Sequence, residues 1–182
     1  AIAIDGPVAA GKTAVGGLVA RRLGFRFFDT GSMYRAVARV ALDRGVDLGD
    51  ADALTALVES VRLRLEATGR GERLTADGRD ITEGLRDAQV ERGVSLVARV
   101  SGVRRALVMQ QRDIAKDGPV VMAGRDIGTV VLPDAPVKVY LTASAEVRAR
   151  RRHEELVARG VAADREQVLK ELTRRDKIDL GR

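Results

Sequence analysis

The stretch Ala1–Thr13, AIAIDGPVAAGKT, decides the fold of this chain. Its apolar first part predicts a buried strand over Ile2–Asp5, and a helix is expected over Lys12–Leu23. Between them, Gly6–Thr13 reads glycine, four other residues, glycine, lysine, threonine. Backbone N–H groups of such a loop turn inward around phosphate oxygens, and the following helix favours an anion at its N-terminus. We therefore predict a phosphate loop for a nucleoside triphosphate. The alternative is a glycine-rich turn before an ordinary helix.

Two side chains of the phosphate loop have expected chemical roles. Lys12 should neutralise the β and γ phosphates of ATP, and the Thr13 hydroxyl should bind Mg²⁺. The residues expected to contact the nucleotide are Gly6, Pro7, Val8, Ala9, Ala10, Gly11, Lys12, Thr13 and Ala14. Inside the helix, Gly16 and Gly17 reduce helix stability, which indicates close packing of that helix against a sheet.

Beyond this unit, strand signals alternate with helical stretches, which is typical of an α/β fold with a parallel sheet covered by helices. Further strands are expected at Phe25–Phe28, Pro119–Ala123 and Val137–Leu141. Helices are expected at Thr30–Arg44, at Val90–Lys116 with a break near Ser101-Gly102, at Ala145–Arg159 and at Asp164–Arg175. The stretch from Val46 to about Arg92 has a different residue pattern from the rest of the chain. It combines a short helix at Asp50–Glu59, alternation from Val61 to Glu66 and an Asp77-Gly78 turn, which together predict a small antiparallel unit.

The composition bounds the class of protein. The chain has 182 residues, of which 45% are hydrophobic, so it can bury one substantial core and a single domain is expected. The absence of cysteine excludes disulfides and thiolate metal sites, and the sequence shows no basic leader or long apolar stretch. We therefore expect a cytoplasmic protein without membrane contact. A monomer is expected because no long exposed apolar stripe is evident.

The net charge of +6 suits either a nucleic-acid partner or an enzyme that handles two anionic substrates. Aromatic residues make up only 3% of the chain, and no basic run is interleaved with them. A stacking surface for single-stranded nucleic acid is therefore not expected. The alternative is a nucleic-acid-binding ATPase, whose ATPase activity DNA or RNA would stimulate.

A phosphate loop is shared by kinases, switch GTPases and mechanical ATPases. The chain has no Asn-Lys-x-Asp segment and no Asp-x-x-Gly after a strand, which disfavours a GTPase. A small-molecule kinase needs a second anion site, built from arginines near the carboxyl ends of the strands. The candidates are Arg35, Arg125, Arg175 and Arg182. The pattern therefore favours a kinase with an anionic acceptor.

Four separated motifs carry a specific resemblance. They are Asp29–Arg35 (DTGSMYR), Gly124–Thr129 (GRDIGT), Pro133–Lys138 (PDAPVK), and Arg174-Arg175-Asp176 followed by Asp179 and Arg182. In this order they resemble the bacterial cytidylate kinases over nearly the whole chain. The resemblance implies a P-loop kinase three-layer fold with a central parallel sheet, in one domain over residues 1–182. It also implies a monophosphate-binding insert at 46–92 and a short lid at 148–164. The further strand and closing helix that are typical of that family beyond the position of Arg182 are expected to be absent from this chain.

The same resemblance implies phosphorylation of CMP and dCMP by ATP. It assigns Arg35, Arg125 and Arg182 to the acceptor phosphate, Ser95 and Arg104 to the cytosine, and Arg175 and Asp179 to the pentose hydroxyls; Thr30 and Tyr34 complete the expected set. Planar guanidinium groups suit the first task because they bind phosphate oxygens in pairs. For the arginines the alternative is a surface ion pair, for the cytosine pair an exposed helix surface, and for Arg175 with Asp179 an ion pair along one helix.

Asp126 is the residue expected to choose the base. A carboxylate can accept a hydrogen bond from the exocyclic amine of cytosine, whereas uracil presents an oxygen at that position. The alternative role of Asp126 is to order Mg²⁺ through water, because it follows a strand that ends near the phosphate loop.

A cluster of arginines, Arg148, Arg150, Arg151 and Arg152, begins the segment that resembles the lid. Such a cluster can lower over the transferring phosphoryl group and exclude water, but it is also typical of a solvated helix face. The residues expected to act in catalysis are Lys12, Arg125, Arg151 and Arg152. A P-loop kinase with another acceptor, such as UMP, a different nucleoside monophosphate or a shikimate-like molecule, is the nearest alternative function.

Overall fold

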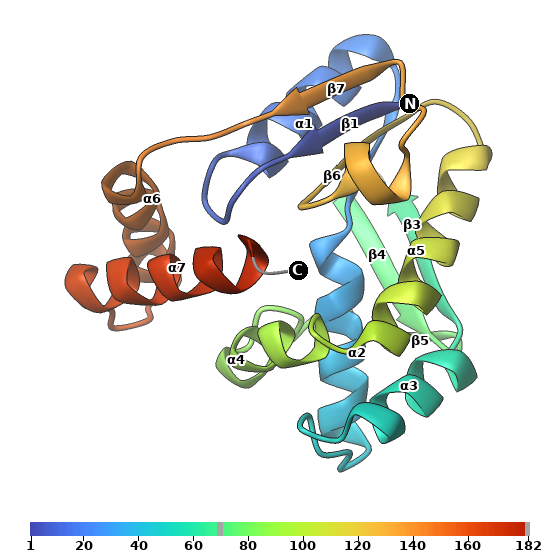
Figure 1. Ribbon diagram of the computed structural model, residues 1–182, viewed down its shortest axis with the longest axis horizontal. Coiled ribbons are helices and arrows are strands. Elements are labelled where there is room, and N and C mark those ends of the chain that lie inside the picture. The colour runs from blue at the N-terminus through green and yellow to red at the C-terminus, as the bar shows by residue number, and fades with distance from the viewer. Residues whose placement is uncertain (69–70, 181–182) are drawn as a thin grey trace. The chain divides into compact units, whose positions relative to one another are not determined.

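The computed structural model describes residues 1–68 and 71–180, with side chains described except at 65–68, 71–72 and 178–180. The described chain forms two compact units (Figure 1). The first joins residues 1–27 with residues from 120 onward, and the second spans Phe28–Pro119. Within the described residues, no helix is both long and apolar enough to cross a bilayer.

The central sheet has four strands in the order β2-β6-β1-β7, and all of it except the last two residues of β2 belongs to the first unit. Its strands are β1 (Ile2–Asp5), β2 (Arg26–Asp29), β6 (Val120–Gly124) and β7 (Val137–Tyr140). Strand β1 pairs in parallel with both β6 and β7, with Ile4 opposite Ala123 on one side and Val139 on the other. Every residue of β6 is buried. The predicted parallel sheet is confirmed, and its strands lie within one or two residues of the predicted ranges.

Helix α1 (Lys12–Leu23) packs against β6 and coincides with its predicted range. It ends at Gly24, which adopts the left-handed conformation (φ 67°) that stops helices without a Cβ penalty. A Cβ on Gly16 would lie 2.5 Å from a ring carbon of Phe27, so close packing at Gly16 is confirmed. At Gly17 the same expectation is wrong, because nothing lies within 4 Å of the corresponding point.

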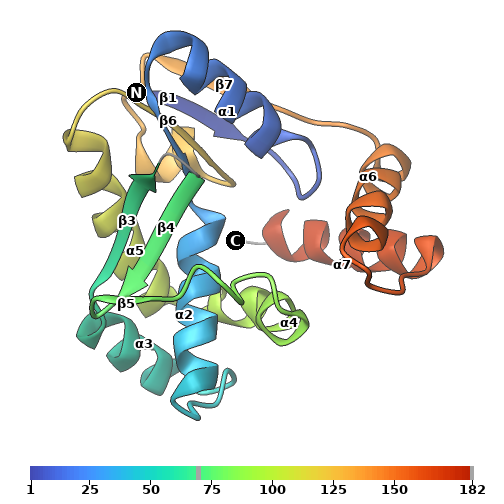
Figure 2. The same ribbon diagram turned by 180° about the vertical axis from the view of Figure 1, so that it is seen from behind.

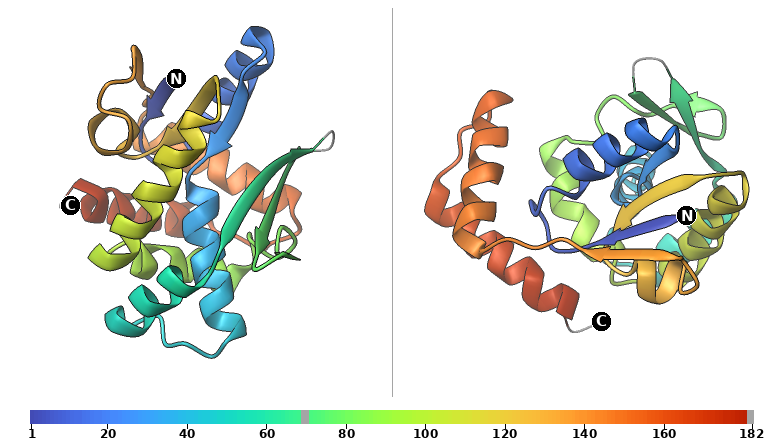
Figure 3. Two further views of the ribbon diagram at one scale, coloured as in Figure 1. Left: turned by 90° about the vertical axis from the view of Figure 1, so that its right-hand side faces the viewer. Right: turned by 90° about the horizontal axis from the view of Figure 1, so that it is seen from above.

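Three helices complete the first unit: the short π-helix η1 (Ile127–Val131), α6 (Ala145–Ala158) and α7 (Arg165–Leu180). Helices α6 and α7 pack against each other through Ala149, Val168 and Leu172 (Figure 3). The Ser144 hydroxyl accepts a hydrogen bond from the Val147 N–H and caps α6. Helix α7 runs further than the predicted Asp164–Arg175.

The second unit combines α-helices with a small antiparallel sheet (Figure 2). The helices are α2 (Gly31–Asp43), α3 (Ala51–Ser60), α4 (Ala88–Val97) and α5 (Ser101–Lys116), and the strands are β3 (Leu63–Thr68), β4 (Gly71–Ala76) and β5 (Arg79–Asp80), in the order β3-β4-β5. The β4–β5 turn lies at Asp77-Gly78, both with positive φ, as a tight hairpin requires. The predicted antiparallel unit and the break between α4 and α5 are both confirmed.

Helix α2 explains why the second unit extends beyond the antiparallel segment. It packs against α3, α4 and β4 through an apolar face that includes Met33, Val37 and Val40. Helix α5 packs against α3, and Gly102 lets the two backbones approach, since a Cβ there would lie 2.3 Å from the Thr55 hydroxyl oxygen. These contacts give residues 28–119 a core of their own.

Candidate active site

The backbone of the phosphate loop passes so close to Leu141 that Gly6 has no room for a side chain. Gly6 has φ 148°, and a Cβ on it would lie 1.9 Å from the Leu141 carbonyl oxygen. Leu141 is held at that place because its N–H donates a hydrogen bond of 2.7 Å to the Asp5 carbonyl. Ala9 (φ 59°) and Gly11 (φ 102°) are also left-handed. The loop therefore has the irregular backbone that turns N–H groups inward.

The positive groups of the loop gather at the start of α1. The Lys12 Nζ donates hydrogen bonds of 2.7 Å to the Gly6 carbonyl and 2.8 Å to the Pro7 carbonyl. Gly11 precedes the helix, no side chain caps the helix start, and its first turn contains no acidic residue. The positive end of the helix dipole and the Lys12 ammonium group thus lie together, which suits a phosphate chain. Thr13 lies in the exposed first turn.

Two arginines of α6, Arg148 and Arg151, donate hydrogen bonds to backbone carbonyl groups of the phosphate loop. Arg148 is only 5% exposed, and its Nη1 donates to the Val8 carbonyl at 3.3 Å. The same guanidinium donates to the Asp176 carboxylate at 3.2 and 2.6 Å and to the Ala143 carbonyl at 3.0 Å. Val8 also packs on the apolar cluster between α6 and α7. Arg148 therefore joins the loop, α6 and α7.

The other arginines of this cluster have different surroundings. The Arg151 Nη1 donates to the Ala10 carbonyl at 3.2 Å, so Arg151 reaches the loop as well. Arg152 pairs with Glu155 on its own helix at 2.9 Å, with 14% of its side chain exposed. Arg150 is exposed, 3.9 Å from Glu154. The exposed Arg150 fits the solvated-face alternative, whereas the burial of Arg148 was not predicted.

Arg125 and Asp126 follow β6 directly and are both half-buried. Strands β1 and β6 are parallel and in register from Ile2 to Asp5, which lies opposite Gly124. The two residues therefore begin at the same edge of the sheet as the phosphate loop. Helix η1 starts immediately after them, and its first two N–H groups, on Ile127 and Gly128, bond to the buried Asp5 carboxylate. Asp5 was not among the predicted site residues, although an ionisable residue at the end of an apolar strand is a signal for one.

In the second unit, three predicted site residues lie at the start of α2: Thr30, Tyr34 and Arg35. The Asp29 carboxylate accepts a hydrogen bond from the Gly31 N–H at 3.0 Å and lies 3.5 Å from the Arg35 guanidinium. Only 17% of the Arg35 side chain is exposed. Thr30 is buried and Tyr34 is half-buried. Arg35 therefore has a carboxylate partner, as the ion-pair alternative expects, but it is not a freely solvated surface residue.

The remaining predicted residues are dispersed over other helices. Ser95 on α4 and Arg104 on α5 are each half-buried rather than fully exposed. Arg175 pairs with Glu171 one turn earlier on α7, at 3.0 Å. The Asp179 side chain and the whole of Arg182 lie outside the residues that the structure describes.

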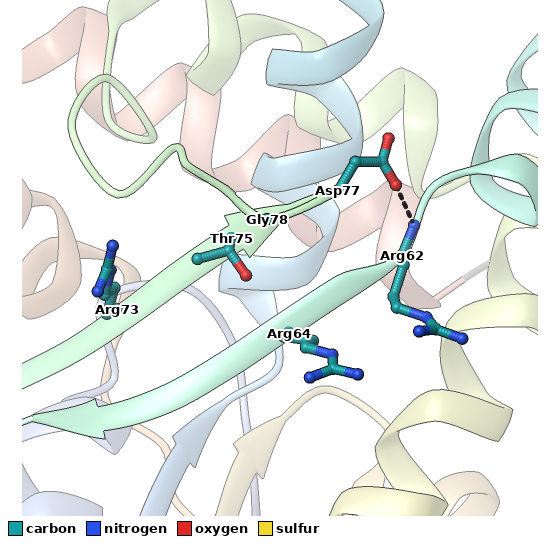
Figure 4. Close-up of a pocket in the computed structure, with 6 residues that line it drawn as sticks. All are labelled: Arg62, Arg64, Arg73, Thr75, Asp77 and Gly78. Atoms are coloured by element: carbon teal, nitrogen blue, oxygen red, sulfur yellow. Dashed lines mark hydrogen bonds between the residues drawn. The ribbon is translucent and has the colours of Figure 1, made fainter.

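A cavity of about 530 Å³ lies on the antiparallel sheet of the second unit (Figure 4). Its lining contains none of the predicted site residues; it consists of Arg62, Arg64, Arg73, Thr75, Asp77 and Gly78. Carboxylates balance part of its charge, since Arg73 pairs with Asp80 at 3.0 Å. Among the residues whose side chains the structure describes, no group of three His, Asp or Glu side chains could hold a metal ion.

Sequence comparisons show which known proteins this chain is similar to. The family model described as cytidylate kinase matches residues 2–182. A cytidylate kinase of Pelotomaculum thermopropionicum is 55% identical over 183 residues, which cover 100% of this chain and 80% of the relative. One from Herpetosiphon aurantiacus is 53% identical over 182 residues, with coverages of 98% and 80%. One from Geobacillus sp. strain WCH70 is 49% identical over 181 residues, with coverages of 100% and 81%. Since both the family model and these relatives span nearly all of it, the chain belongs to the cytidylate kinase family.

Proposed function

We propose that this protein transfers the terminal phosphoryl group of ATP directly to CMP or dCMP, giving ADP and CDP or dCDP. The observation that carries the proposal is the phosphate loop Gly6–Thr13, with its left-handed glycines and Lys12, in a chain of the cytidylate kinase family. Phosphoryl transfer gives a protein little covalent work, so alignment of the two anions and neutralisation of their charge supply most of the rate.

On the donor side, backbone N–H groups of the loop and the first turn of α1 bind the phosphate chain. Lys12 exchanges its hydrogen bonds with the Gly6 and Pro7 carbonyls for phosphate oxygens. The Thr13 hydroxyl is the one protein ligand we propose for Mg²⁺, and the ion would supply charge neutralisation at the transferred group. An exposed hydroxyl at the helix start fits that requirement.

On the acceptor side, Arg35 and Arg125 hold the phosphate of CMP, together with Arg182. Arg35 is already shielded from water, which strengthens its attraction for an anion relative to a solvated arginine. An incoming phosphate competes with Asp29 for this guanidinium, so the Asp29 carboxylate keeps Arg35 oriented until the acceptor binds. Thr30, Tyr34, Ser95, Arg104, Arg175 and Asp179 form the rest of the proposed acceptor site.

The acceptor-binding insert and the lid are also part of the proposal. We assign the insert to residues 46–92, within the compact second unit, and the lid to residues 148–164, which include most of α6 and the turn after it. Arg151 and Arg152 stabilise the transferring phosphoryl group when the lid closes and excludes water. We also propose that the protein is cytoplasmic and monomeric. Gel filtration with light scattering tests the oligomeric state.

Asp126 selects cytosine by accepting a hydrogen bond from its exocyclic amine. Initial rates with CMP, dCMP, UMP, AMP and shikimate, at saturating Mg-ATP, test both the reaction and this role. We expect CMP and dCMP to be the preferred acceptors. In Asp126→Asn, kcat/KM for CMP should fall by about 10- to 100-fold, because a buried polar contact is worth about 1 to 3 kcal/mol. The UMP rate should be unchanged or higher.

Asp134→Asn is the matched control, because Asp134 is an exposed carboxylate a few residues further along and should be silent. If Asp126 instead orders Mg²⁺ through water, Asp126→Asn will lower the CMP and UMP rates equally and shift the Mg²⁺ dependence. A wild-type enzyme that turns over UMP as fast as CMP would refute the assigned role. Turnover with none of the nucleotides would refute the proposed function.

A further inference from the structure

The Asp5 carboxylate is buried at the point where β1 ends. Asp5 is 9% exposed, and its two oxygens accept different backbone hydrogen bonds. Oδ1 accepts from the Ile127 N–H at 2.6 Å, and Oδ2 accepts from the Gly128 N–H at 2.8 Å. These short contacts join residues more than 120 positions apart. A buried carboxylate is costly unless it is hydrogen-bonded in this way, so the contact fixes both segments.

The segment held by Asp5 is the one that follows Arg125 and Asp126. Helix η1 begins at Ile127, so its first N–H groups come directly after these two residues. Gly128 permits the approach, because a Cβ there would lie 3.2 Å from the Asp5 Oδ2 and 3.2 Å from the Lys138 Cδ. A displacement at Ile127 would therefore move the backbone that carries Arg125 and Asp126.

The other neighbour of Asp5 is the phosphate loop. Gly6 follows Asp5 in the chain, and the Asp5 carbonyl also holds Leu141, against which Gly6 packs. One residue thus bonds through its side chain to the segment of Arg125 and Asp126, and through its backbone to the loop. A change of the side chain alone should disturb the first connection and spare the second.

We propose that Asp5 is a positioning residue that sets Arg125 and Asp126 relative to the phosphate loop, and so controls acceptor alignment and base choice. This inference rests on the proposed function. In this role Asp5 acts through the backbone of Ile127 and Gly128, whose N–H groups it binds, and not through contact with a nucleotide. Asparagine cannot replace it, because its NH₂ group would face one of the two N–H donors that the carboxylate satisfies.

The test is Asp5→Asn, measured for kcat and KM with CMP and with UMP, and for affinity toward a fluorescent ATP analogue. We expect kcat/KM for CMP to fall by about 10-fold or more, since small misplacement of catalytic groups costs up to about 100-fold. The ratio of CMP to UMP turnover should fall as well, while affinity for the ATP analogue changes less than about twofold. A merely structural role would reduce the active fraction and leave that ratio unchanged.

Asp50→Asn is the matched control. Asp50 is also a carboxylate that accepts hydrogen bonds from two backbone N–H groups, those of Asp52 and Ala53 at the start of α3. Its replacement should lower stability without altering the CMP to UMP ratio. In an Asp126→Asn background, Asp5→Asn should have little further effect on that ratio, because both changes act on one element.

If Asp5→Asn fails to fold, Gly128→Ala is the second test of the positioning role. Its added Cβ disturbs the same contact, and the Asp5 carboxylate is retained. It should lower the CMP to UMP ratio in the same direction. The inference is overturned if the folded variant keeps the wild-type ratio and CMP KM, or if affinity for the ATP analogue falls as much as CMP turnover. Lack of CMP turnover in the wild-type enzyme would instead refute the proposed function, so the two failures are distinguishable.

Discussion

Gly6→Ala should disable the phosphate loop by a steric conflict that cannot be relieved by a side-chain rotation. The new Cβ would lie 1.9 Å from the Leu141 carbonyl oxygen and 3.0 Å from its carbonyl carbon. That is about 1.5 Å inside ordinary van der Waals contact, and both partners are backbone. The φ of 148° adds strain, because L-residues with a side chain rarely adopt it.

The expected loss in the free energy of unfolding of Gly6→Ala is the sum of these two costs. Overpacking costs about 1 to 3 kcal/mol, and a disfavoured backbone conformation costs a similar amount. We therefore expect Gly6→Ala to lower the free energy of unfolding by about 4 kcal/mol. For a chain of this size the melting temperature should fall by about 8 to 16 °C. Affinity for ATP should fall too, because the backbone that lines the phosphates must move.

Gly17→Ala is the control, since it makes the same chemical change in the helix that follows. Nothing lies within 4 Å of a Cβ at Gly17, and alanine is the better helix former by about 0.5 to 1 kcal/mol. This variant should melt slightly higher than the wild type and bind ATP equally well. Thermal melts followed by circular dichroism, together with ATP titrations, compare the two variants. Equal melting temperatures and ATP affinities for Gly6→Ala and wild type would refute the reasoning.

Two further predictions concern charged groups. Arg148→Met should lower the free energy of unfolding by about 3 kcal/mol and raise the KM for ATP, because the half-buried Asp176 and the Val8 carbonyl each lose their donor; urea unfolding that matches wild type would contradict this. The N–H of Arg62, then the Arg44 guanidinium, lower the pKa of Asp77, so its stabilisation exists at neutral pH and is lost as the pH falls through that lowered pKa. Asp77→Asn should accordingly reduce the urea midpoint more at pH 7 than at pH 3, and an equal reduction at both pH values would refute the assignment.

Features encoded by neighbouring residues could be predicted from the sequence. The phosphate loop, α1 and the Asp77-Gly78 turn each depend on local backbone requirements, and the structure has all three where they were expected. Gly16 and Gly17 mark the limit of this reasoning. A helical glycine indicates a close approach only if a neighbour such as Phe27 is there, and the sequence does not say which glycine has one.

Features that depend on distant residues could not be predicted. The bonds from Asp5 to η1 require the parallel register of β1 and β6, which no local pattern encodes. Arg148 looked like its neighbours in a charged run, and only the packing of α6 against α7 buries it beside Asp176. The compact second unit likewise exceeds the predicted antiparallel segment because α2 and α5 contribute their apolar faces to it.

The fate of the terminal phosphate of ATP gives the most direct test of the proposed reaction. ATP labelled at that phosphate is incubated with the protein, Mg²⁺ and CMP, and the labelled products are separated. The label should appear in CDP as fast as ADP forms, and Lys12→Met should abolish its appearance. Label found only in inorganic phosphate, or left entirely in ATP, would contradict transfer between two nucleotides held end to end.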